Sequence, residues 1–147
     1  MSSESREYLR KAEARLEAAK ELLSSRRYED SVSRAYYCAL SCARAALTLK
    51  DSHPKTHEGT LRAFGELFVK GEGWPKTMGA SFSRLKALRD KADYSPSIEA
   101  TKEDAEWSLR AAADFLKETK SRLRQSQVCR TPSLQVSMPR RSENREP

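Results

Sequence analysis

Residues 28–50 read YEDSVSRAYYCALSCARAALTLK, and this stretch determines the fold that we expect for the chain. Its apolar residues recur at spacings of three and four, which is the period of an α-helix with one buried face. The side chains on that face are Val32, Ala35, Tyr36, Ala39, Ala43, Ala46 and Leu47. Most of them are small and let neighbouring helices approach closely, so the pattern predicts a central helix over Tyr28–Lys50.

Four further stretches have the helical period and are separated by segments rich in Gly, Pro or Ser. They cover about Ser3–Ser25, Thr56–Lys70, Gly79–Tyr94 and Thr101–Arg124. Thr101, followed three residues later by Asp104, predicts a capped start for the last helix. The predicted fold class is therefore all-α, an antiparallel bundle of four to five helices.

The chain has 147 residues, which suits one domain with its own core. We place that domain at residues 1–124. From residue 125 to residue 147 the apolar period is lost and three prolines occur, so we expect a disordered basic tail. The net charge is +7, and a surplus of this sign is compatible with RNA as a partner as well as with an ordinary basic protein.

Several classes of protein receive no support from the sequence. No apolar run approaches the roughly 20 residues of a membrane span, and the N-terminus has no apolar signal region, so we expect a cytoplasmic protein that does not contact membranes. Three cysteines cannot all pair, which favours reduced thiols. Gly-rich phosphate loops, Ser-His-Asp arrangements and paired carboxylates are not evident, and we expect no cofactor.

One spacing resembles a zinc site, with Cys38 and Cys42 followed by His53 and His57. Both cysteines fall within the central helix among alanines, where the close packing of helices favours small apolar side chains. We therefore predict buried thiols and no metal.

The end of the fourth helix combines charge with a phenol, in the sequence RDKADY at residues 89–94. One interpretation is surface structure only, in which Arg89 and Asp93 form an ion pair one turn apart and Tyr94 covers the helix end. The other is a functional cleft. Arg89 and Tyr94 lie about 140° apart around a helix, so this second interpretation needs a bend or a second subunit.

Four motifs together resemble the HEPN domain family, specifically its small stand-alone prokaryotic members. They are Ser33-Arg34-Ala35-Tyr36-Tyr37, His57-Glu58-Gly59, Phe64 with Phe68-Val69-Lys70, and Arg89-Asp90-Lys91-Ala92-Asp93-Tyr94. The resemblance covers roughly residues 4–122. It implies an up-and-down helical bundle that forms a homodimer and is often encoded beside a minimal nucleotidyltransferase as a toxin–antitoxin pair.

Many members of that family are metal-independent endoribonucleases with an arginine followed a short distance later by a histidine. Here Tyr94 stands where that histidine is expected. We therefore expect a regulatory module that binds nucleotide or RNA at a dimer cleft, with Arg34, His57, Arg89 and Asp90 as binding residues. The alternatives are an endoribonuclease toxin with Arg89, Asp93 and Tyr94 as catalytic residues, and a purely structural helical partner.

Overall fold

The computed structural model describes residues 1–94, 96 and 99–144, with the side chains of this part as far as residue 126. Every element in these residues is a helix, which confirms the all-α class. They are α1 (Ser3–Ser24), α2 (Tyr28–Leu47), the 3-10 turn η1 (Thr48–Lys50), α3 (His57–Phe64), the π-helical turn η2 (Gly65–Lys70), α4 (Lys76–Tyr94) and α5 (Lys102–Asn144). Within the described helices, none combines the length and the apolar character needed to cross a membrane.

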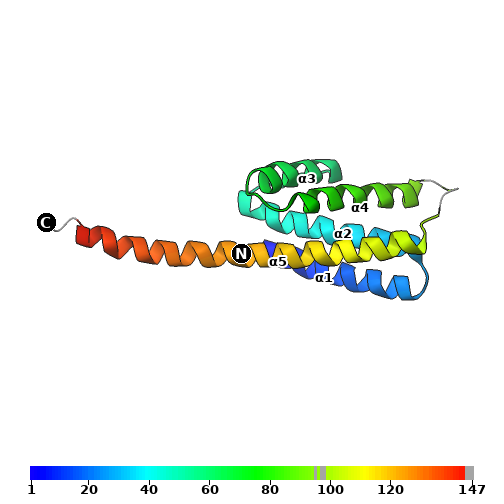
Figure 1. The fold of residues 1–147 in the computed structure, drawn as a ribbon, viewed down its shortest axis with the longest axis horizontal. Coiled ribbons are helices and arrows are strands. Elements are labelled where there is room, and N and C mark those ends of the chain that lie inside the picture. Colours follow the sequence, from blue (N-terminus) through cyan, green and yellow to red (C-terminus); the bar gives the residue numbers. More distant parts are fainter. Residues whose placement is uncertain (95, 97–98, 145–147) are drawn as a thin grey trace.

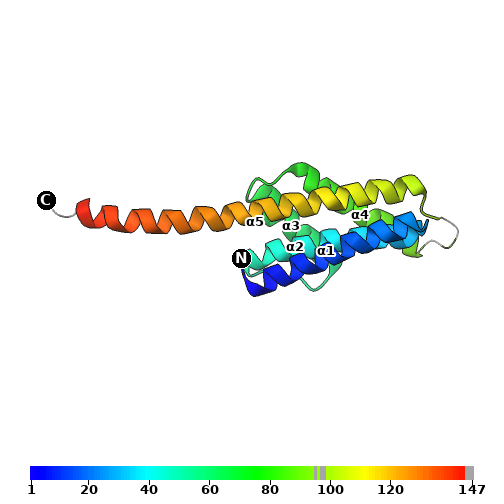
Figure 2. The ribbon, with the colours of Figure 1, turned by 90° about the horizontal axis from the view of Figure 1, so that it is seen from below.

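Helix α2 is the central helix, as predicted, because it contacts α1, α3, α4 and α5. Figure 1 shows α1 on one side of α2, and α3 with α4 on the other. Figure 2 shows α5 running alongside the bundle, with its C-terminal part extending past it. All seven side chains that the apolar pattern assigned to the inner face of α2 are buried.

The contact between α1 and α2 is built from small side chains and two buried serines. Ser5 Oγ donates to the carbonyl oxygen of Ala45 at 3.1 Å, and Ser31 Oγ donates to that of Ala19 at 2.8 Å. Each of these hydrogen bonds joins one helix to the other. Because both hydroxyls are fully buried, the bonds satisfy groups that would otherwise be costly to desolvate.

Aromatic side chains fill the other part of the core, where α3, η2 and α4 meet α5. Phe64 stacks on Phe68 at 5.8 Å between ring centroids and lies 5.3 Å from Phe115. Phe82 lies 5.6 Å from Phe115, and Trp74 lies 4.6 Å from Phe68. This cluster fixes the position of α4 against the rest of the bundle.

The predicted stretches Tyr28–Lys50 and Thr56–Lys70 end in the turns η1 and η2 rather than as regular α-helix, and the bounds of α4 and α5 also differ from the prediction. Helix α4 begins at Lys76 rather than Gly79, because Pro75 is tolerated just before a first turn and its carbonyl oxygen accepts the amide of Met78 at 3.0 Å. The cap of α5 is confirmed, since Thr101 and Asp104 exchange hydrogen bonds. The backbone of α5 continues beyond Arg124 to Asn144, because the apolar period marks the end of the buried stripe rather than of the helix. We expected a disordered basic tail over residues 125–147. The side chains from residue 127 onward lie outside the described part, so this expectation stays a prediction.

The turn η2 requires glycine at position 71. A Cβ atom there would lie 2.4 Å from the carbonyl oxygen of Leu67, whereas a Cβ at Gly65 would meet nothing within 4 Å. We predict that Gly71→Ala lowers the free energy of unfolding by about 2 kcal/mol. Gly65→Ala, at a helical position, raises it by about 0.5–1 kcal/mol. Urea unfolding of the two variants measures both effects, and equal shifts would contradict this account of η2.

Candidate functional site

Arg89, in the last part of α4, lies at the centre of a polar cluster between α2, α3 and α4. Its side chain is only 15% exposed. Nη2 donates to the hydroxyl of Tyr37 at 2.8 Å, and Nη1 donates to Asp90 Oδ1 at 3.2 Å. Nε lies 2.9 Å from Asp93 Oδ2 in an ion pair rather than an aligned hydrogen bond. The contact with Tyr37 ties α4 to α2.

Three tyrosine rings surround the Arg89 guanidinium. Its central carbon lies 5.8 Å from the ring centroid of Tyr36, 5.4 Å from that of Tyr37 and 5.8 Å from that of Tyr94. These distances are within the range of cation–π attraction. Arg89 and Tyr94 thus meet within one chain, without the bend or second subunit that their angular separation suggested, because the arginine side chain is long enough to reach the ring.

His57 enters the same cluster from a different helix. Its ring lies 5.6 Å from Tyr36 and 5.8 Å from Tyr37. It is the first residue of α3, after the cap in which Thr56 Oγ1 accepts the amide of Gly59 at 2.9 Å. A Cβ at Gly59 would lie 2.8 Å from that oxygen, which explains why glycine stands two residues after the histidine.

The electrostatics of the cluster follow from burial and from its cations. Burial lowers the pKa of His57, and the positive charges of Arg44, Arg89 and Lys86 lower it further. Burial acts to raise the pKa of Asp90, but hydrogen bonds and charge from Lys86 and Arg89 bring it below its usual value. Lys86 Nζ lies 2.8 Å from Asp90 Oδ2. The imidazole is therefore neutral at pH 7, and the carboxylate is charged.

Tyr36 forms the inner wall of the cluster. Its side chain is fully buried against Phe82, at 6.1 Å between centroids, as expected for a core residue. Burial raises the pKa of its hydroxyl to about 12. Within the described part of the chain, that hydroxyl is buried without a hydrogen-bond partner.

We call this group of side chains the Arg89 cluster. Its members are Tyr36, Tyr37, His57, Lys86, Arg89, Asp90, Asp93 and Tyr94. It contains five of the six residues that the sequence predicted for the site. The sixth, Arg34, is exposed on α2, and none of the contacts described for the chain joins it to the cluster, so its role stays a prediction.

The sequence did not point to Tyr37 or Lys86 as site residues. Lys86 lies one helical turn before Arg89, and that spacing is the signal that would have identified it. Tyr37 had no such signal. Only Tyr36 lies on the predicted buried face, and Tyr37 lies about 100° around the helix from it, so the apolar pattern did not mark Tyr37.

The other candidate sites are weaker. Cys38 and Cys42 are buried free thiols, as predicted. Among the described residues, no group of three His, Cys, Asp or Glu side chains gathers as a metal site would require. A hollow of about 170 Å³ between the start of α4 and α5 is bordered by Asp114 and Glu118, whose charges disfavour a polyanion.

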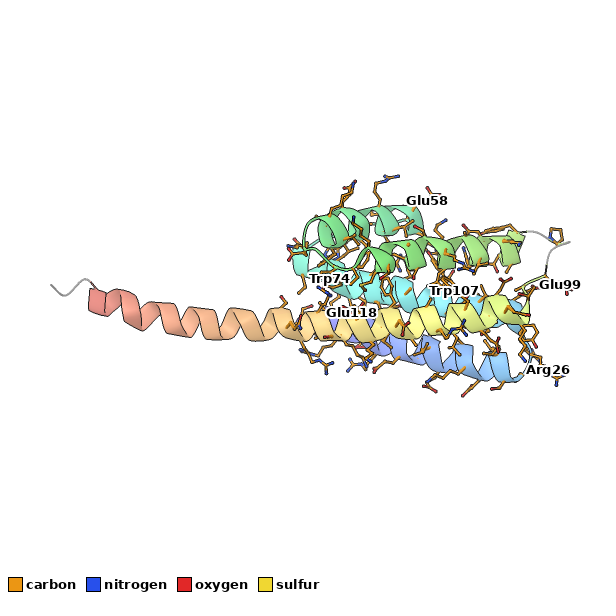
Figure 3. The ribbon with its side chains drawn as sticks, viewed as in Figure 1. Arg26, Glu58, Trp74, Glu99, Trp107 and Glu118 are labelled. Atoms are coloured by element: carbon orange, nitrogen blue, oxygen red, sulfur yellow. The ribbon has the colours of Figure 1, made fainter. Side chains whose placement is uncertain are left out.

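Figure 3 shows the side chains of the bundle, with Glu58, the neighbour of His57, at the start of α3. Glu58 is exposed, whereas His57 is half-buried. The two adjacent residues therefore face different surroundings, and the histidine is the one that belongs to the Arg89 cluster.

The hydrogen bond between Arg89 and Tyr37 gives a testable expectation for stability. Tyr37→Phe removes the acceptor of a largely buried cation and should lower the free energy of unfolding by about 1–2 kcal/mol. Tyr8→Phe, a half-buried tyrosine on α1, serves as the matched control, with an expected change within about 0.5 kcal/mol. Thermal unfolding of both variants measures the difference, and a Tyr37→Phe variant as stable as the control would contradict the role of the bond.

Comparison with known proteins agrees with this architecture. The model of the family described as "HEPN domain" matches residues 5–123. Two proteins of Methanocaldococcus jannaschii named as candidate toxins are each 36% identical to the chain, over 115 and 114 residues. These matches cover 78% of the chain in both cases, and 78% and 84% of the relatives.

A protein of Thermotoga maritima, whose name states no activity, is 33% identical over 107 residues, which are 73% of this chain and 81% of the relative. The match to the family model extends over nearly the whole helical bundle, including α2, α3 and α4, which carry the Arg89 cluster. The chain belongs to the HEPN domain family.

Proposed function

We propose that the chain is the HEPN component of a toxin–antitoxin-type pair and that it binds nucleotide or RNA at the Arg89 cluster. Two relatives are named as candidate toxins, which supports the assignment to a toxin–antitoxin-type pair. The observation that carries the second part is the arrangement of Arg89, a largely buried cation held in place by Tyr37 of another helix. A positioned guanidinium of this kind is suited to a phosphate group.

Two features of the cluster fit a nucleotide. Tyr37 and Asp90 each take one N–H of Arg89 and Asp93 faces Nε, so one N–H on each terminal nitrogen is left for a ligand. Tyr94 is 72% exposed and offers a ring face on which a base can stack. The net charge of +7 adds a general attraction for polyanions.

The proposal includes two partners that the family resemblance implies, a second copy of the chain and a minimal nucleotidyltransferase. The exposed hydroxyl of Tyr94 is accessible to such an enzyme as an acceptor of an adenylyl group. Light scattering of the purified chain measures the first association, with a dimer mass expected. The second partner is tested by mixing the chain with the transferase and a nucleoside triphosphate. Mass spectrometry then measures whether an adenylyl group is added to the chain.

Binding of a short oligoribonucleotide tests the role of Arg89. We expect Arg89→Gln to weaken binding at least tenfold and to reduce the slope of log affinity against log salt by about one. Arg62→Gln, which removes an exposed arginine of α3, makes the same change in net charge and is the control. Equal losses in the two variants, measured by fluorescence anisotropy, would show that binding depends on net charge and not on the Arg89 cluster.

The second candidate is a metal-independent endoribonuclease, and the position of His57 favours it. A neutral imidazole in the same cluster as Arg89 supplies the histidine proton acceptor that is missing from the end of α4, where Tyr94 stands in its place. If the chain is such an enzyme, RNA is cleaved in the presence of a chelator, and Arg89→Gln and His57→Gln each abolish cleavage. Intact RNA after incubation with wild-type protein would eliminate this candidate and leave the binding function.

A further inference from the structure

Two cations of α4 share a single carboxylate at the centre of the Arg89 cluster. Lys86 Nζ donates to Asp90 Oδ2 at 2.8 Å, and Arg89 Nη1 donates to Asp90 Oδ1 at 3.2 Å. Each oxygen of Asp90 therefore faces a different cation, and the carboxylate bridges the two. The phosphate group of a nucleotide or of RNA presents the same arrangement, with charged oxygens on one central atom.

The carboxylate is the most exposed part of this bridge. The side chains of Lys86 and Arg89 are 17% and 15% exposed, whereas that of Asp90 is 35% exposed. A ligand that approaches from water therefore meets Asp90 before it reaches both cations. Ion pairs that water can reach contribute little to stability, so the carboxylate can turn away at small cost.

The charges of the cluster suit the exchange of one anion for another. Lys86 and Arg89 are balanced by Asp90 and Asp93, and the imidazole of His57 is neutral at pH 7. A phosphate added while Asp90 stays in place would give the site a surplus of negative charge, and like charges at such distances repel. A phosphate that replaces Asp90 between the two cations takes over both of its contacts.

The exchange leaves Arg89 in position and frees donors for a phosphate. Arg89 keeps its hydrogen bond to Tyr37 and its ion pair with Asp93 when Asp90 leaves. Both N–H groups of Nη1 and one of Nη2 are then available. The ammonium of Lys86 adds the N–H that it now donates to Asp90.

We propose that Lys86 is a second phosphate-binding residue beside Arg89, and that the phosphate of the bound nucleotide or RNA takes the place that the Asp90 carboxylate occupies in the free chain. This inference rests on the proposed function, because it assumes a phosphate-bearing ligand at the Arg89 cluster. Asp90 then competes with the ligand, which is the opposite of the binding role expected from the sequence.

Binding of AMP and of a short oligoribonucleotide to the full chain tests the role of Asp90. Asp90→Asn keeps the shape of the side chain and removes its charge, so we expect it to tighten binding by roughly threefold or more. Glu21→Gln, which removes an exposed carboxylate of α1, makes the same change in net charge and is the control. Affinity in Asp90→Asn that is no higher than in Glu21→Gln would overturn the exchange.

The two ligands distinguish the source of the phosphate. If a terminal phosphate fills the place of Asp90, AMP and the oligoribonucleotide both bind more tightly to Asp90→Asn. If a phosphodiester fills it, only the oligoribonucleotide does.

Lys86→Gln tests the second cation. We expect it to weaken binding by roughly tenfold and to lower the slope of log affinity against log salt by about one. Lys117→Gln, which removes an exposed lysine of α5, is the control and should bind like wild type.

The double variant Lys86→Gln/Asp90→Asn separates direct contact from an effect through Asp90. The loss of affinity should persist in the Asp90→Asn background, because the lysine contacts the phosphate itself. Binding by the double variant as tight as by Asp90→Asn alone would show that Lys86 acts only on Asp90 and would overturn its binding role. Circular dichroism checks that each variant is folded.

These results also separate the inference from the proposed function. Loss of binding in Arg89→Gln together with wild-type affinity in Lys86→Gln would overturn the inference and leave the proposed function standing. Absence of binding of both AMP and RNA to the wild type would overturn both.

Discussion

The close approach of α2 to the other four α-helices is the constraint on which the rest of the structure depends. Ala12 and Ala19 of α1, and Ala39 and Ala43 of α2, are all fully buried. Side chains this small bring helix backbones near enough for Ser5 and Ser31 to bond across the interface. Larger residues at these positions would separate the helices and cost about 1–3 kcal/mol each.

The same packing creates the candidate site at the border of the core. Tyr36 belongs to the buried face of α2, and Tyr37, the next residue, lies half-buried at its edge. Because α4 packs against that edge, Arg89 is largely removed from water and needs acceptors close by. Asp90 and Asp93 of α4 and Tyr37 of α2 supply them, and the bond to Tyr37 joins the two helices at the site.

The helices and the central role of α2 could be predicted from periodicity, because the buried faces repeat at helical spacing. The cap at Thr101 was also predictable, because a capping motif depends on residues that are near one another in the sequence. The contact between Arg89 and Tyr37 was not, since it depends on how α2 and α4 pack, and 52 positions separate the two residues in the chain. His57 was selected through the family resemblance, and its position beside Tyr36 and Tyr37 emerged only from the structure.

The central claim is that one cluster, built by three helices of a single chain, binds a phosphate-bearing ligand. Chemical-shift mapping during titration with AMP tests it most directly, using backbone amides and arginine side-chain Nε–H resonances. The account predicts the largest changes at Tyr37, His57 and Arg89, with little change along α1. Changes centred on the hollow at Asp114 and Glu118, or small changes spread over the whole basic surface, would contradict it.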